Sequence, residues 1–109
     1  MEIKHKTWLE RDGRVIFGPG RDRLLKAIDE CHSLNSAAKK LKMSYRAAWG
    51  RIKASEKRLG IKLVEMDSVK HGMHLTHEAR ELINCFDQIE RDIARILKKA
   101  QCRLQLDRS

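Results

Sequence analysis

A long apolar repeat near the C-terminus limits this fold more than any other feature of the sequence. Along residues 77–104, which are predicted to form one helix, apolar side chains recur from Leu82 onward at alternating spacings of four and three residues. Such a helix is about 42 Å long at 1.5 Å per residue, and one small domain cannot cover its whole apolar face. We therefore expect its first turns, with Ala79, Leu82 and Ile83, to pack on the domain core. We expect the rest to pair across a two-fold axis with a second copy, through Phe86, Ile89, Ile93, Ile96, Leu97 and Ala100.

The positive charge is concentrated in a short part of the chain. The chain has 109 residues and a net charge of +9, and residues 36–62 hold nine basic residues against Glu56 alone. An excess of this size indicates a polyanionic partner, and nucleic acid fits it better than a membrane surface.

Composition excludes several other classes of protein. The apolar fraction of 41% and the charged fraction of 36% are typical of one folded domain. No window is apolar enough to span a membrane, and the first residues lack a signal peptide, so we expect a cytoplasmic, nucleoid-associated protein without a membrane partner. Three widely spaced cysteines argue against a disulfide framework and a zinc module.

The order of predicted elements indicates the fold class. Residues 6–11 and 14–17 flank Asp12-Gly13 as a β-hairpin, and Gly18-Pro19-Gly20 then starts a helix. This Gly-Pro-Gly lacks the Gly-Lys-Ser/Thr ending of a nucleotide loop, so we interpret it as helix punctuation.

A second helix is expected over residues 35–41, with Asn35 or Ser36 as its cap. After the turn at Lys42-Met43, a third helix starts with Ser44 as its cap and ends at Leu59-Gly60. Two strands, 63–66 and 73–76, flank a polar tip at Gly72, and Thr76 caps the long last helix.

This order predicts a mainly α protein with small β content: a winged helix-turn-helix with an N-terminal β-hairpin, a β-hairpin wing and a long C-terminal dimerisation helix. We divide it into a DNA-binding domain, residues 1–76, and a dimerisation helix, residues 77–109.

The third predicted helix has two faces of opposite character. Ala48, Ile52, Ser55 and Leu59 share one face, and a basic stripe occupies the other, formed by Arg46, Gly50, Lys53 and Lys57. A helix that is apolar behind and basic in front suits the major groove of DNA. Two alternatives remain open: the stripe is a solvated surface, or Tyr45 and Trp49, at helical spacing, belong to the core.

The residue types suggest separate roles in binding double-stranded DNA. Arg46 can donate two hydrogen bonds to guanine, while Lys53 and Lys57 suit phosphates. Gly50 allows a close approach of the helix backbone, at a cost of about 1 kcal/mol relative to Ala. The full set of candidate DNA-binding residues is Ser36, Ser44, Tyr45, Arg46, Gly50, Lys53, Lys57, Lys70, His71 and His74.

Other chemistry is less well supported. His71, His74 and His77 are evenly spaced, but no carboxylate or cysteine completes a metal site, so we expect no metal and no cofactor. No catalytic carboxylate pair or nucleotide loop stands out, and we do not expect an enzyme. Two alternatives to a sequence-specific regulator are a non-specific, chromosome-associated nucleic-acid-binding protein and a protein-interaction module that uses the long helix.

Two runs, residues 36–49 (SAAKKLKMSYRAAW) and 56–65 (EKRLGIKLVE), resemble the winged helix-turn-helix domain of the ModE (molybdate-responsive) regulators. The same frame is similar to the wider LysR-type domain, and Trp8–Gly13 and Phe17–Arg21 extend the ModE likeness upstream. The resemblance covers about residues 6–80 and implies a bacterial transcriptional regulator that binds DNA as a dimer.

The chain departs from the ModE pattern in three respects. Lys42 stands where the turn usually has glycine, and the wing tip is less glycine-rich. The effector-binding domain of full-length ModE proteins is absent from the 109 residues, so we expect no molybdate site in this chain.

Overall fold

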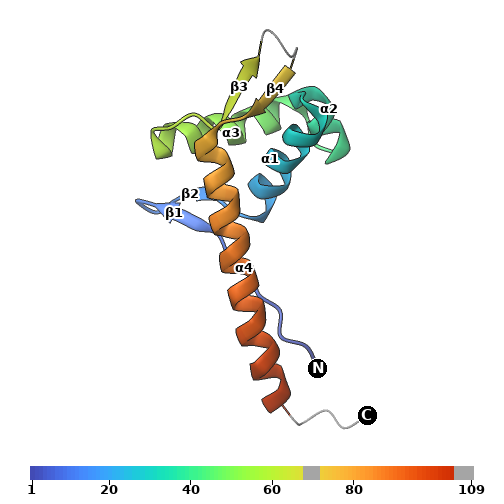
Figure 1. Cartoon of the computed structure of the whole chain (residues 1–109), viewed down its shortest axis with the longest axis vertical. Coiled ribbons are helices and arrows are strands. Elements are labelled where there is room, and N and C mark those ends of the chain that lie inside the picture. Colours follow the sequence, from blue (N-terminus) through green and yellow to red (C-terminus); the bar gives the residue numbers. More distant parts are fainter. Residues whose placement is uncertain (68–71, 105–109) are drawn as a thin grey trace.

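The computed structural model describes residues 1–67 and 72–104. A small body of helices and β-hairpins carries a long last helix that projects well beyond it (Figure 1). The elements, which follow the predicted order, are β1 (Leu9–Arg11), β2 (Arg14–Phe17), α1 (Pro19–Cys31), α2 (Leu34–Lys40), α3 (Tyr45–Leu59), β3 (Val64–Asp67), β4 (Gly72–Leu75) and α4 (His77–Arg103).

Three of the helix boundaries follow from capping chemistry read in the sequence. The Ser44 hydroxyl accepts a hydrogen bond from the Ala47 amide at 3.0 Å, and Thr76 caps α4 in the same way. Gly60 ends α3 in the left-handed conformation, with φ +72°.

The predicted cap of α2 is wrong. Ser33, rather than Asn35 or Ser36, is the N-cap, and its hydroxyl accepts the Ser36 amide at 3.1 Å. Leu34 is buried and opens the helix. All three polar residues can cap a helix, and the burial of Leu34 selects the earliest of them.

The two hairpins are separate antiparallel sheets. The first turns at Asp12 and Gly13, both with positive φ, as a tight hairpin requires. Its first strand, Leu9–Arg11, is shorter than predicted, and its pairing register shifts between Leu9 and Glu10.

The second hairpin, β3–β4, is the wing, and the predicted tip at Gly72 is wrong. Gly72 is the first residue of β4 and pairs with Asp67. A Cβ at Gly72 would lie 2.7 Å from the backbone oxygen of His32, which the Met73 amide binds at 2.8 Å. The glycine therefore lets the wing strand lie directly against the end of α1.

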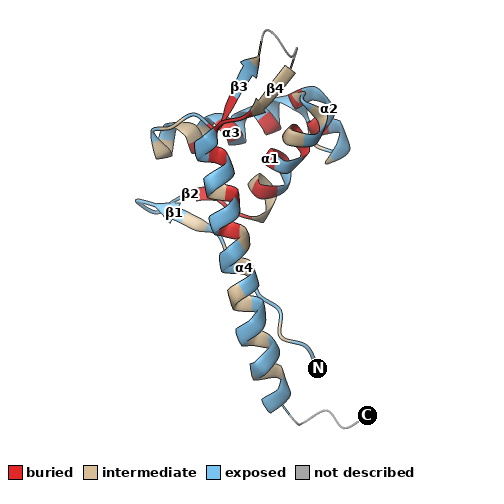
Figure 2. Ribbon diagram, in the orientation of Figure 1, coloured by how far each residue is buried: buried red, intermediate tan, exposed pale blue. Residues whose placement is uncertain are grey.

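The core lies where α1, α2, α3, β2 and the first half of α4 meet (Figure 2). Phe86 is 2% exposed, and its ring meets that of Phe17 edge-to-face, with centroids 5.2 Å apart. The prediction of Phe86 in the seam between copies is therefore wrong, because its side chain fills the protomer's own core.

The second half of α4 has few neighbours on one side and the N-terminal segment on another. The Ile3 amide donates to the Gln101 side chain at 3.0 Å, and Ile3 and Leu97 line the same shallow pocket. Ile89 and Ile96 are exposed, Ile96 by 65%, and Ile93 and Ala100 are half-buried. These four residues form what we call the apolar seam.

Within the described parts of the chain, no helix is long and apolar enough to cross a membrane.

Candidate nucleic-acid interface

The third helix divides into the two faces that its sequence predicts. Its inner face buries Ala48, Ile52 and Ser55. The four residues of the basic stripe, Arg46, Gly50, Lys53 and Lys57, are all exposed. At Gly50 nothing lies within 4 Å of the position that a Cβ would occupy, so the helix backbone is open to an approaching ligand.

Two aromatic side chains border the stripe. Tyr45 is 53% exposed and Trp49 is 37% exposed. Their assignment to the core, which the sequence left open, is therefore wrong. The ammonium group of Lys53 lies 4.4 Å from the centre of the Trp49 ring, a cation–π contact that holds the lysine along the helix.

Glu56 joins the helix to the wing. Its carboxylate accepts the Leu63 amide at 2.8 Å and lies 3.1 Å from the ammonium group of Lys53. Burial alone would raise the pKa of the Glu56 carboxyl, but hydrogen bonds from Leu63, Lys53 and Val64 outweigh it and lower that pKa. The charge of Lys53 is therefore partly compensated within the protein, whereas Arg46 and Lys57 have no acidic partner in the described structure.

The turn between α2 and α3 sets the orientation of the third helix. Lys42 adopts the left-handed conformation, with φ +57°, at the position where the ModE pattern has glycine. The Met43 amide closes the turn by donating to the Ala38 oxygen at 2.9 Å. Ala37 and Ala38 are fully buried between the two helices, and Ser36, on the first turn of α2, is exposed.

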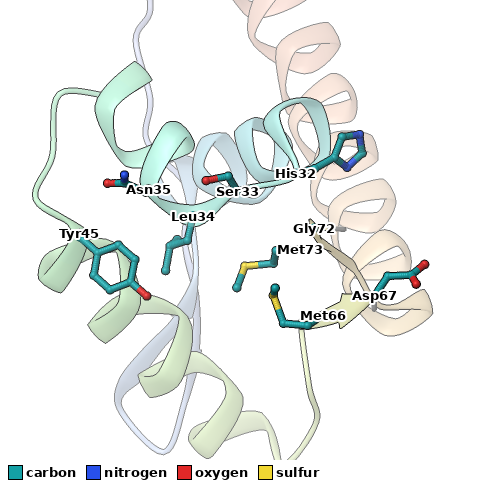
Figure 3. Close-up of a pocket in the computed structure, with 9 residues that line it drawn as sticks. All are labelled: His32, Ser33, Leu34, Asn35, Tyr45, Met66, Asp67, Gly72 and Met73. Carbon is teal, nitrogen blue, oxygen red and sulfur yellow. The ribbon is translucent and has the colours of Figure 1, made fainter. Parts of the chain in front are cut away.

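A hollow of about 660 Å³ separates the start of α3 from the wing. Figure 3 shows Leu34, Tyr45, Met66 and Met73 around it, from α2, α3 and the two wing strands. Met66 is 71% exposed, and it is a surface residue of the site that was not predicted from the sequence. Its position in an apolar strand pattern gives no signal that distinguishes it from a core residue.

The histidines of the wing region occupy different surroundings. The His74 imidazole lies 3.2 Å from the Glu65 carboxylate on the paired strand, and His77 lies 2.9 Å from Glu81 on α4. Lys70 and His71, both predicted to contact DNA, lie outside the described residues. Across residues 1–67 and 72–104, no three histidine, cysteine or acidic residues are grouped as metal ligands.

Comparison with known proteins gives consistent results. Residues 22–80 match the family model for bacterial regulatory helix-turn-helix proteins of the lysR family. The transcriptional regulator ModE of Haemophilus influenzae is 40% identical over 80 residues, which are 71% of this chain and 31% of that protein. The molybdenum-pterin-binding protein MopB of Rhodobacter capsulatus is 32% identical over 102 residues, 91% of this chain and 37% of that protein. The chain thus spans about a third of the length of these relatives.

Solved structures share the fold. The CbnR DNA-binding domain in complex with DNA superposes with a TM-score of 0.61 at 21% identity, covering 79% of this chain and 97% of that one. The complex of the BenM DNA-binding domain with the benA site 1 DNA gives a TM-score of 0.60 at 20% identity, covering 81% and 97%. The chain therefore has the winged helix-turn-helix fold with a long C-terminal helix that its sequence predicts.

Proposed function

The chain belongs to the lysR family of bacterial regulatory helix-turn-helix proteins, and we propose that it is a transcriptional regulator that binds specific DNA sequences as a homodimer. The observation that carries this proposal is the exposed basic stripe of α3, which lies opposite a fully buried face. A helix anchored in this way can enter the major groove without exposing the core.

Individual residues of the stripe have different roles in this function. Arg46 lies in the first turn of α3, where reading helices contact base edges, and its guanidinium matches two acceptors of guanine. Lys57 and Lys53 bind phosphates, Lys53 in a direction set by Trp49. Tyr45 buttresses the bases beside Arg46.

The contacts with the DNA backbone extend beyond α3. Ser36 and Ser44 present hydroxyl groups at the starts of α2 and α3. His74, with Lys70 and His71, contacts the adjacent groove from the wing.

The homodimer forms through α4. Ile89, Ile93, Ile96 and Ala100 continue the heptad spacing beyond the core and bury their exposed apolar area against the same residues of a second copy. In this arrangement residues 1–76 read DNA and residues 77–109 hold the two readers together. Their α3 helices then meet half-sites about one helical turn apart.

A competition titration tests sequence specificity. A duplex recovered by binding selection from random DNA is compared with a scrambled duplex of the same length and composition. We expect the recovered duplex to bind at least about 1,000-fold more tightly at the same salt concentration. Equal affinity for the two duplexes would instead identify a non-specific nucleic-acid-binding protein. A monomer that binds neither duplex at low salt would identify a protein-interaction module.

A further inference from the structure

Another pocket lies on the side of α3 that faces the N-terminal hairpin. Its volume is about 290 Å³, and it is formed by the N-terminal segment, β2, the start of α1 and the middle of α3. The residues that line it are Lys6, Trp8, Val15, Gly18, Pro19, Gly20, Arg21 and Arg51.

Positive charge gathers in this pocket without a counter-charge. Lys6, Arg21 and Arg51 line it, Arg58 adjoins Arg21, and no acidic residue is among the lining residues. None of these four basic groups has a carboxylate partner within the described parts of the chain. Like charges brought together in this way repel one another, so the arrangement costs stability unless an anion joins it.

The geometry keeps these groups in place. The Arg21 guanidinium donates to the Ser55 hydroxyl at 2.7 Å, and Arg58 donates to the Val15 carbonyl at 2.5 Å. Burial lowers the pKa of Arg21, and the charges of Arg58 and Arg51 lower it further. Arg21 and Arg58 are therefore held in place by neutral partners that leave their charge uncompensated.

Backbone groups add to the positive potential on one wall. The Arg51 guanidinium lies 3.6 Å from the position of a Cβ at Gly20, so it sits directly over the first turn of α1. Gly18, the N-cap of this helix, provides no side-chain acceptor. The positive end of the helix dipole thus lies beside the Arg51 guanidinium, and the carboxylate of Asp22 in the same turn is paired with Lys26.

We propose that this pocket binds a phosphate group between Arg51, Arg21 and Lys6. Arginine forms paired hydrogen bonds with phosphate oxygens, and phosphate supplies the negative charge that the pocket lacks. The phosphate group comes either from a free phosphate-bearing molecule or from the DNA backbone. The inference stands apart from the proposed function, since free phosphate tests it in the absence of DNA.

The first experiment titrates the full chain with inorganic phosphate and follows amide and indole resonances by NMR, with sodium chloride adjusted to hold the ionic strength constant. We expect saturable shifts at Trp8, Gly20 and Arg51. Arg51→Gln and Lys6→Gln should each weaken phosphate binding about tenfold. Arg91→Gln, which removes the same charge from an exposed position on α4, should leave it unchanged. Because Arg51→Gln also relieves repulsion, we expect it to melt at the parent temperature or above.

The second experiment measures how the affinity for a random duplex depends on salt, with the same variants. If Arg51→Gln and Lys6→Gln each reduce the salt slope by about one, the phosphate group is that of DNA. An unchanged slope together with phosphate-dependent shifts identifies a free phosphate-bearing ligand. Both results support the site. It is overturned if phosphate moves none of these resonances and neither variant alters the salt slope.

Discussion

The two longest helices, α3 and α4, each bury one face and leave another free, but the free faces differ in chemistry. The inner face of α3 packs Ala48 and Ile52 in the core, and its outer face presents arginine and lysine. The first half of α4 packs Ala79, Ile83 and Phe86 in the core, and its second half exposes isoleucine (Figure 2).

This difference shows that two helices anchored in the same way can suit two kinds of partner, depending on the chemistry of the free face. Both helices are anchored by buried apolar side chains, so each presents its free face rigidly. A charged free face remains hydrated until a polyanion replaces its counterions, whereas an apolar free face is stabilised by meeting another apolar surface. The comparison therefore supports the proposal that α3 binds DNA and that α4 pairs with a second copy.

The largest expected effect lies on the buried face of α4. Phe86→Ala removes a ring that is 2% exposed and packed on Phe17. We expect the free energy of unfolding to fall by about 3–5 kcal/mol, measured by urea denaturation. A loss below about 1 kcal/mol would show that α4 is not anchored in the core as described.

The free face of α4 should respond differently. Ile96→Asp puts a charge into the apolar seam of both copies, and we expect dimerisation to weaken about a hundredfold while the helix content stays unchanged. Sedimentation equilibrium measures the dissociation constant, and Arg91→Gln is the matched control because it changes the charge by the same amount on an exposed site. If the parent protein is monomeric at every concentration measured, the proposal that α4 pairs with a second copy is wrong.

The free face of α3 should affect DNA binding without affecting folding. We expect Arg46→Ala to weaken binding to a selected duplex by about 1–3 kcal/mol and to relax the preference at one base pair. Fluorescence anisotropy with the selected and single-substituted duplexes measures both effects. If the variant binds every duplex as the parent does, Arg46 is not the base-reading residue.

The smallest effect concerns the junction between α3 and the wing. Glu56→Gln weakens the acceptor of the Leu63 amide and removes the partner charge of Lys53, at an expected cost of about 1 kcal/mol at pH 7. Because folding lowers the pKa of Glu56 below 4.5, its carboxylate stabilises the fold above that pH, and this contribution is lost as the pH falls through the folded-state pKa. Urea unfolding at pH 7 and at pH 3 should therefore show a larger gap between parent and variant at pH 7 than at pH 3. An equal gap at both pH values would exclude the carboxylate as its source.

Features that depend on local chemistry were predictable from the sequence. Ser44, Thr76 and Gly60 each combine a residue type with a change of periodicity, and the structure confirms all three helix boundaries. The two faces of α3 were equally predictable, because helical spacing alone separates them.

Features that depend on distant parts of the chain were not predictable. Phe86 and Ile89 follow the same heptad pattern, and only the position of Phe17 in space places Phe86 in the core. Gly72 looks like a turn residue, but its role follows from the backbone oxygen of His32, which lies 2.7 Å from the place that a Cβ would occupy there. The pocket between α1 and α3 likewise needs Lys6, Arg21 and Arg51, which are far apart in the sequence.

The sequences of the duplexes that the protein selects from random DNA test the central claim most directly. A dimer joined through α4, with one α3 helix in each major groove, predicts an enriched palindrome whose half-sites lie about one helical turn apart. Each half-site should contain a guanine that Arg46 contacts. No enrichment, or a single half-site without symmetry, would contradict the assignment of α3 to DNA reading and of α4 to the dimer.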